Sequence, residues 1–414
     1  MRILLSVYLA VFFLSALLSF ILDRINIRHL MSHGHEAPDV FKGEIDEVTL
    51  LRMRDYTLAR SRIGSFEDLL QAALTLFILL SGFISWFAGK ILVLEMGYIV
   101  SGILFFFGIA LFLGVFEIPF ELHRNFVIER RYGFSTITFG LWFSDFIKTT
   151  IISAILFSII LSALLGLISA APDTWWLWMW GFYFLFQLLI NILYPVLIAP
   201  LFNKFEPLSD PALKEGIIAL MEKAHLKAKG IYKVDAIKRS RHSNAYFTGL
   251  SRTKRIVLFD TLLSSHARDE ILAVLAHEVG HWKKGHILKQ FVFSTFFSLF
   301  LFYLAYLLMN WTPLYSTFGV TVQAPYVGLL LLGLVAKPFA FFLMPLRSGI
   351  SRAFEKQADD YGYELLGGPQ PLVRALKRLA KENLSNLHPH PVFAWVYYHH
   401  PPLTERIQRL ILEK

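Results

Sequence analysis

Residues 96–116 have the sequence MGYIVSGILFFFGIALFLGVF, which contains no charged side chain. A helix that crosses the hydrocarbon core of a bilayer, about 30 Å thick, needs about 20 mostly apolar residues. This stretch meets that requirement, and a helix that is apolar on every side must be buried in a large core or in a membrane. We therefore expect residues 96–116 to span a membrane.

Six further stretches on either side of this run are long and apolar enough to do the same: Ile3–Leu22, Leu69–Ala88, Thr149–Ala170, Trp175–Leu197, Phe291–Leu308 and Tyr326–Leu346. Trp and Tyr cluster at several of their ends, as in the interfacial belts of membrane proteins. The first stretch exceeds the usual apolar region of a signal peptide, and no A-x-A-like cleavage site follows it, so we expect a retained helix. The sequence predicts an all-α polytopic membrane protein with seven transmembrane helices.

The composition agrees with this prediction. Of the 414 residues, 55% are hydrophobic and 17% are charged, whereas soluble globular chains carry about 25% charged residues. A disordered chain is excluded, and an ordinary soluble enzyme is disfavoured. The chain has no Cys, which excludes disulfides, thiolate zinc ligands and a cysteine nucleophile. Any metal must therefore bind to His, Asp or Glu.

Lys and Arg are concentrated on one side of the predicted spans. The connections between spans 1 and 2, 3 and 4, and 5 and 6, and the C-terminal tail, are rich in basic residues, whereas the opposite side carries only Arg2 and Lys90. Because basic loops stay in the cytoplasm, we expect the N-terminus outside and both the C-terminus and the large hydrophilic segments inside, at the inner membrane if the source is bacterial. The net charge of +9 then reflects topology, and no nucleic-acid partner is predicted.

The alternation of apolar and hydrophilic stretches predicts four regions. Residues 1–199 would hold transmembrane helices 1–5, residues 200–289 a cytoplasmic metallopeptidase segment, residues 290–347 transmembrane helices 6 and 7, and residues 348–414 a cytoplasmic C-terminal segment. Helical spacing over 210–226 and 267–286, with strand-like pieces at 246–247 and 255–259, predicts a small, mostly helical domain with a short β element.

The pentapeptide His277-Glu278-Val279-Gly280-His281 has the form H-E-x-x-H. On a helix, residues four apart lie one turn apart on one face, so both imidazoles can bind one Zn²⁺. Glu278 would lie near the open position of the metal and can move a proton from water to the leaving amine. A motif of five residues with three specified is only modest support for a zinc site. The alternative interpretation of this motif is a polar helix face without a metal.

A third ligand is needed, and its type separates the enzyme classes. His286 does not have the metzincin spacing, and the best candidate is Glu355, which lies one helical turn from Asp359. One of these carboxylates can bind the metal while the other holds the free N–H of a ligand imidazole. Spans 6 and 7 form a hairpin that brings Glu355 back to the side of His277. Charged residues bracket the H-E-x-x-H helix, which argues against a protease with its motif inside a span.

The chain resembles the type I CaaX prenyl proteases, seven-span membrane zinc metallopeptidases of the H-E-x-x-H…E-x-x-x-D type. Because eukaryotic members are typically longer, we expect a prokaryotic homologue. The resemblance covers nearly the whole length and rests on an ordered set of segments: Phe126–Phe134, Tyr194–Phe205, His242–Gly249, His277–Trp282, Phe354–Asp359 and His400–Arg406. Such a set is far more specific than H-E-x-x-H alone.

The resemblance implies a ring of seven helices around an intramembrane chamber, with one Zn²⁺ per chain at its cytoplasmic end. Its implied ligands are His277, His281 and Glu355, and its catalytic base is Glu278. The remaining implied roles are Asp359 beside a ligand, His400 near the scissile carbonyl, and Asn244, Ala245 and Tyr246 beside the substrate. Lys337 in span 7 would face the chamber or extend to the interface.

The predicted function is hydrolysis of peptide bonds by zinc-activated water. The partners are the lipid bilayer and a peptide or protein substrate, prenylated or not. In the family, the reaction removes a C-terminal tripeptide from prenylated CaaX proteins, and a general cleavage of membrane-associated peptides would use the same site. Two alternatives stay open from the sequence: a stress-type quality-control protease, and a seven-span transporter or scaffold without catalysis.

Overall fold

The computed structural model describes residues 2–248 and 255–412. Within them, seven helices are long and apolar enough to cross a membrane: α1 (Arg2–His33), α2 (Glu47–Leu80), α4 (Tyr98–His123), α6 (Phe139–Ala170), α7 (Trp175–Leu193), α11 (His286–Met309) and α13 (Pro325–Leu366). After α4, the helix continues through η2 (Arg124–Ile128) and α5 (Glu129–Arg131), and after α7 through η3 (Tyr194–Ile198) and η4 (Ala199–Leu201). The seven spans predicted from hydropathy are confirmed in number and order.

The second span differs from its predicted bounds. The apolar run predicted to end at Ala88 is divided, because α2 ends at Leu80 and a short helix, α3 (Phe83–Leu92), follows it. Gly82 between them has φ of 80°, a left-handed conformation that glycine adopts without steric cost. Hydropathy does not report such a break, because the residues on both sides of it are apolar.

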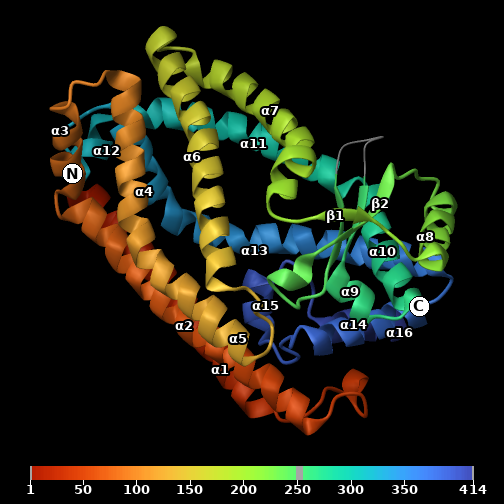
Figure 1. Ribbon diagram of the computed structural model, residues 1–414. Coiled ribbons are helices and arrows are strands. Elements are labelled where there is room, and N and C mark those ends of the chain that lie inside the picture. Colours follow the sequence, from red (N-terminus) through yellow and green to blue (C-terminus); the bar gives the residue numbers. More distant parts are fainter. Residues whose placement is uncertain (1, 249–254, 413–414) are drawn as a thin grey trace.

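The seven long helices form a ring in which each contacts the next, in the order α1, α2, α4, α6, α7, α11, α13 and back to α1 (Figure 1). At one end of the ring, Phe105 of α4, Leu165 of α6 and Tyr326 of α13 belong to one buried apolar cluster. Most residues in the apolar part of each span are not buried within the protein, as expected of helices that face lipid. The apolar cluster closes the ring at the end where α13 begins, and the chamber implied by the resemblance stays a prediction.

The hydrophilic segment after α7 forms a four-stranded sheet with the order β1 (Phe205–Pro207), β2 (Gly230–Val234), β4 (Arg255–Phe259), β3 (Ala245–Thr248). The β2/β4 pair is parallel, and the two outer pairs are antiparallel. The strand-like pieces expected at 246–247 and 255–259 are confirmed as β3 and β4. Since β3 lies at the end of the strand order, one of its edges has no strand partner among the described residues.

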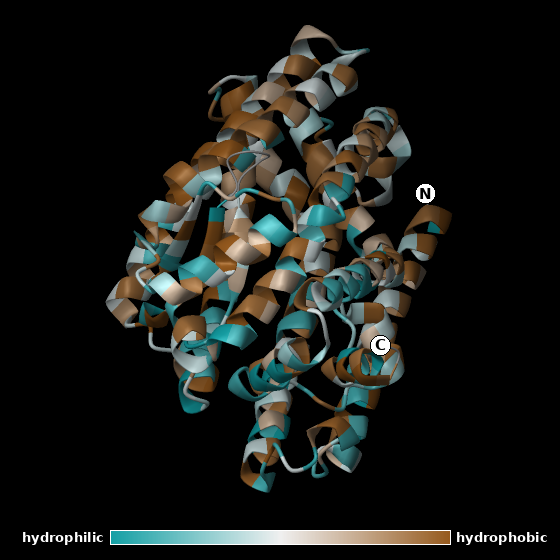
Figure 2. Cartoon of the chain, turned by 90° about the vertical axis from the view of Figure 1, so that its right-hand side faces the viewer, coloured by the Kyte–Doolittle hydropathy of each residue, from teal (hydrophilic) through white to brown (hydrophobic). Residues whose placement is uncertain are grey.

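Helices cover this sheet and join it to the C-terminal region. They are α8 (Pro211–Lys223), α9 (Asp260–Ser265), α10 (Arg268–Lys283), α14 (Gln370–Glu382), α15 (Pro391–Tyr397) and α16 (Leu403–Leu412), with η5 (Ala236–Lys238) in a loop. Ile256 of β4 and Leu275 and Val279 of α10 are fully buried in their shared core. Two further short helices, η1 (Asp39–Phe41) and α12 (Thr312–Thr317), lie in connections between spans. Hydrophobic residues dominate the long helices, and hydrophilic residues gather around the C-terminus (Figure 2).

Helix α13 carries both the seventh span and Glu355. Helix α13 continues without a break from Pro325 to Leu366, so the segment with Glu355 is a direct extension of the seventh span. Its interior contains Pro338 and Pro345, which membrane-spanning helices tolerate when neighbouring groups satisfy the freed backbone. The C-terminal part of α13 therefore places Glu355 at the end of the ring that is opposite to Tyr326.

Candidate metal centre

Helix α10 positions two imidazoles on one face. Its first turn is stabilised by Glu270, whose Oε2 accepts a hydrogen bond of 2.8 Å from the N–H of Ala267. One face of α10 is buried against the sheet, so the adjoining face, which carries His277 and His281, points at α13. The Nε2 atoms of His277 and His281 lie 3.2 Å apart. The helical placement expected for the H-E-x-x-H motif is confirmed.

The backbones of helices α10 and α13 approach each other closely where the two helices cross. A Cβ atom at Gly280 would lie 2.7 Å from the carbonyl oxygen of Ala358, and one at Gly362 would lie 3.2 Å from the backbone N of His277. Only glycine at position 280 therefore permits this approach without displacing backbone. The close crossing brings the two histidines of α10 to the carboxylates of α13.

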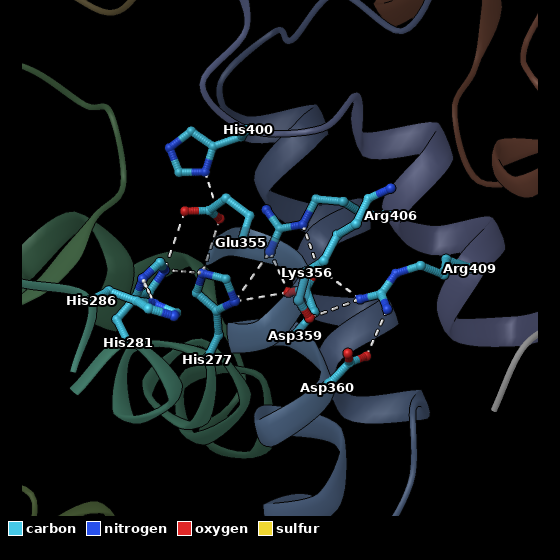
Figure 3. A network of polar contacts seen from close by, with 10 residues as sticks. All are labelled: His277, His281, His286, Glu355, Lys356, Asp359, Asp360, His400, Arg406 and Arg409. Atoms are coloured by element: carbon cyan, nitrogen blue, oxygen red, sulfur yellow. Dashed lines mark hydrogen bonds and ion pairs between the residues drawn. The ribbon is translucent and has the colours of Figure 1, made fainter. Parts of the chain in front are cut away.

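Glu355 completes a three-residue cluster. Its Oε1 lies 3.2 Å from Nε2 of His281, and its Oε2 lies 3.3 Å from Nε2 of His277 (Figure 3). Among the described residues, these three form the only group of at least three His, Cys, Asp or Glu side chains whose ligand atoms converge. Zinc ligands about 2.0–2.1 Å from a tetrahedral ion lie about 3.4 Å from one another. The observed spacings fit that geometry.

The burial of Glu355 also favours a cation. Its side chain is only 5% exposed, and Oε2 accepts no hydrogen bond of acceptable geometry from a described residue, although Nδ1 of His400 lies 2.7 Å away. A buried charge is costly unless it is paired or coordinates a metal. The two nitrogens and one carboxylate are the ligand types that zinc accepts in hydrolytic sites. The residues present therefore fit a zinc ion.

Asp359 lies behind His277, away from the ligand cluster. Its Oδ1 lies 2.8 Å from Nδ1 of His277, and Arg406 of α16 donates to both of its carboxylate oxygens, at 2.6 and 2.9 Å. Burial alone would lower the pKa of His277, but its hydrogen bonds with Asp359 and Glu355 raise that pKa to about 9. The carboxylates thus favour positive charge at this position.

Two further neighbours of the cluster were not identified from the sequence. His286, considered there only as a third ligand, has its Nδ1 3.0 Å from Nδ1 of His281. Arg406 appeared only as part of a family segment, with no role of its own. The spacing of His286 gave no signal, because a turn between α10 and α11 rather than a continuous helix brings it to His281.

Glu278 and His400 lie at the edge of the cluster. Glu278 follows His277 on α10, is partly exposed, and makes no hydrogen bond or ion pair with any described residue. His400 lies in the loop before α16, with its side chain 65% exposed and Nδ1 against Glu355. Both side chains are therefore accessible to a molecule that approaches Glu355 from solvent.

Asn244, Ala245 and Tyr246 lie at the start of the edge strand. Ala245 and Tyr246 pair with Leu258 and Val257 of β4, and Asn244 is exposed. The same strand is packed against α10, since the ring centroids of Phe247 and Trp282 lie 5.5 Å apart. Trp282 directly follows His281 in the sequence. Gly249, the last residue of this family segment, lies outside the described residues. The edge strand thus adjoins the helix that carries the histidines.

Comparisons with known proteins cover nearly the whole chain. Residues 26–204 match the CAAX prenyl protease N-terminal domain, described as five membrane helices, and residues 207–413 match Peptidase family M48. The CAAX prenyl protease 1 homolog of Arabidopsis thaliana is 34% identical over 90% of both chains. CAAX prenyl protease 1 of Saccharomyces cerevisiae is 35% identical over 91% of this chain and 88% of its own. The crystal structure of S. mikatae Ste24p superposes with a TM-score of 0.90 at 32% identity, over 98% of this chain and 97% of that one.

Proposed function

Since the chain belongs to Peptidase family M48 and carries the membrane domain of the CAAX prenyl proteases, we propose that it hydrolyses peptide bonds with one Zn²⁺ held by His277, His281 and Glu355. It is a multi-pass membrane metalloprotease of the CAAX prenyl protease type. The observation that carries the zinc proposal is the convergence of these three side chains at spacings of 3.2–3.3 Å.

A bound Zn²⁺ would supply positive charge that activates a water molecule and polarises the scissile carbonyl. Glu278, which is partly exposed beside His277 on α10, accepts the proton of the attacking water on its carboxylate and then donates it to the leaving amine. Asp359 accepts the Nδ1–H of His277, so that Nε2 of His277 presents its lone pair to the cluster. These assignments give a gluzincin-type site, with two His and one Glu as ligands.

The substrate would bind beside α10. An extended peptide can add, through main-chain hydrogen bonds, to the edge of β3 that has no strand partner in the described part of the chain, with Asn244, Ala245 and Tyr246 along its path. His400 would donate a hydrogen bond to the scissile carbonyl, because its exposed ring already lies against Glu355. In this proposal residues 1–199 and 290–347 supply the membrane helices, and residues 200–289 and 348–414 supply the hydrolytic unit.

The proposed substrates are prenylated proteins with a C-terminal CaaX sequence, since the relatives are named CAAX prenyl proteases. The match of residues 26–204 to the CAAX prenyl protease N-terminal domain favours this function over that of a stress-type quality-control protease. The seven-helix ring favours a lipid-modified substrate over an unmodified one, because a lipid-soluble group can remain within the membrane while the attached peptide reaches the cluster. The proposed orientation has the N-terminus outside, and the cluster and the C-terminus in the cytoplasm.

The test uses full-length protein in detergent and two matched peptides with CaaX ends, one prenylated and one not, with products mapped by mass spectrometry. Glu278→Gln should retain zinc and lose turnover, whereas the control Glu364→Gln, at an exposed position of α13, should cleave normally. Cleavage of the prenylated peptide alone supports a CaaX protease, and equal cleavage of both indicates a general membrane peptidase. Cleavage unaffected by Glu278→Gln would contradict the role proposed for Glu278. No cleavage by the zinc-loaded protein would contradict the proposed hydrolysis and favour a non-catalytic scaffold.

A further inference from the structure

His286 is enclosed on the side of His281 that faces away from Glu355. Its residue is 1% exposed, and its ring stacks on Phe354 with centroids 4.2 Å apart and planes at 7°. Its Nδ1 lies 3.0 Å from Nδ1 of His281, and its Nε2 lies 3.1 Å from Oε1 of Gln357. Both ring nitrogens therefore have a polar neighbour, and the ring is held in one orientation.

These contacts define where the protons lie. Nε2 of His281 faces Nε2 of His277 and Oε1 of Glu355, so in the neutral ring a ligating Nε2 leaves the proton on Nδ1. That Nδ1–H can donate to His286 only if Nδ1 of His286 carries no proton. The proton of neutral His286 then lies on Nε2 and is donated to Oε1 of Gln357. In this series of two hydrogen bonds, from His281 to His286 and from His286 to Gln357, each donor has one acceptor.

The turn after α10 creates this arrangement. Lys284 is the C-cap of α10, and Gly285, with φ of 68°, is the N-cap of α11. A residue five positions after His281 on one continuous helix would lie on a different face. The left-handed residue reverses the chain instead, so that His286, the first residue of α11, returns to His281. Phe354 and Gln357, which hold His286 in place, flank Glu355 on α13.

We propose that His286 is a positioning residue that orients His281 as a metal ligand, by accepting the Nδ1–H of His281 and passing the hydrogen-bond chain on to Gln357. The inference rests on the proposed zinc site. His277 has an anionic acceptor, Asp359, which Arg406 neutralises, whereas His281 has a neutral acceptor. The two ligand histidines are thus oriented by chemically different groups, and no second buried carboxylate is added beside Glu355.

The test measures zinc affinity, by competition with a chromophoric chelator, on full-length protein stripped of metal in detergent. His286→Phe keeps an aromatic ring against Phe354 and removes both nitrogens, and we expect its Kd for zinc to rise by about 10- to 100-fold. His286→Asn restores an acceptor near the position of Nδ1, and its Kd should return to within about threefold of the original. His35→Phe, at an exposed histidine far from the cluster in sequence, is the control and should bind zinc normally.

A second readout separates positioning from a purely structural role. The visible spectrum of the Co²⁺-loaded protein reports the geometry around the metal, and it should change in His286→Phe and recover in His286→Asn. A structural role alone predicts a lower melting temperature of the metal-free protein with unchanged Kd and spectrum. That result would overturn the proposal, as would equal weakening by His286→Phe and His286→Asn.

Gln357→Leu provides an independent arm, because this side chain is exposed and its replacement should not impair folding. If His286→Phe does not fold, Gln357→Leu decides: a raised Kd supports the hydrogen-bond chain, and an unchanged Kd rejects it. If the unsubstituted protein binds no zinc, the proposed function fails. If it binds zinc but His286→Phe binds equally tightly, only the positioning role fails.

Discussion

Nδ1 of His277 lies 2.8 Å from Oδ1 of Asp359, across the crossing of α10 and α13. The same carboxylate is fully buried and accepts two hydrogen bonds from Arg406 of α16. One side chain of α13 therefore joins a proposed metal ligand to the C-terminal helix. Removing its charge should affect metal binding before it affects the fold of the membrane helices.

We expect Asp359→Asn to weaken zinc binding by about 10- to 100-fold, because the amide holds the Nδ1–H of His277 less strongly than the carboxylate does. Competition with a chelator measures this change on purified protein. Asp360→Asn is the matched control, since Asp360 pairs with Arg409 whereas Asp359 pairs with Arg406. A similar loss of affinity in both variants would show that the effect is not specific to the contact with His277.

Gly280→Ala should destabilise the protein by about 1–3 kcal/mol, because the added methyl group overlaps the backbone of α13 at Ala358 and must separate the helices. Zinc content should fall with it, since the two halves of the cluster lie on the separated helices. The melting temperature in detergent and the bound metal measure both effects. Gly333→Ala, whose Cβ would meet no heavy atom within 4 Å, should be neutral or stabilising by up to about 1 kcal/mol. Equal stability of both variants would refute the tight crossing.

Stability should fall below about pH 6.5 because of His266. This residue is 7% exposed, Nδ1 lies 2.8 Å from the hydroxyl of Ser265, and Nε2 has no hydrogen-bond partner among the described residues. Burial lowers its pKa to about 4, so the unfolded chain binds a proton that the folded protein excludes as the pH falls from 6.5 towards 4. Its contribution is fully present above pH 6.5 and is lost below it, by at most about 1.4 kcal/mol per pH unit.

Replacing the titrating group isolates this contribution from those of the other histidines. The difference in melting temperature between the unsubstituted protein and His266→Gln should be constant above pH 7 and should shift in favour of His266→Gln between pH 6.5 and 4. Parallel pH profiles of the two proteins over this range would contradict the assignment.

The proposed orientation can be tested with single cysteines, because the chain contains none. Asn310→Cys lies in the connection between α11 and α12, and Glu382→Cys ends α14 on the side of the proposed metal site; both positions are exposed. In intact cells, a membrane-impermeant maleimide should label Asn310→Cys and reach Glu382→Cys only after the cells are opened. Labelling in the reverse pattern would invert the topology.

Hydropathy was sufficient to predict the seven spans, because crossing a bilayer depends on the summed transfer free energy of about 20 consecutive residues. The same sum does not detect the break at Gly82, where the apolar run continues while the backbone turns. It also did not show that α13 joins the seventh span to Glu355, since Arg347 ends the apolar run while the helix goes on. Apolar content therefore specified the membrane segments and left the helix ends open.

The sequence by itself determined the local chemistry. The spacing of His277 and His281 defines a pair on one helical face, and the hairpin of spans 6 and 7 returns Glu355 to the same side of the membrane. Only the tertiary structure decided that His286 returns to His281 and that Arg406 reaches Asp359. These contacts depend on the turn at Gly285 and on the close crossing of α10 and α13, which leaves no room for a Cβ atom at position 280. Packing between segments that are distant in the sequence leaves no periodic pattern along the chain, so the sequence does not reveal these contacts.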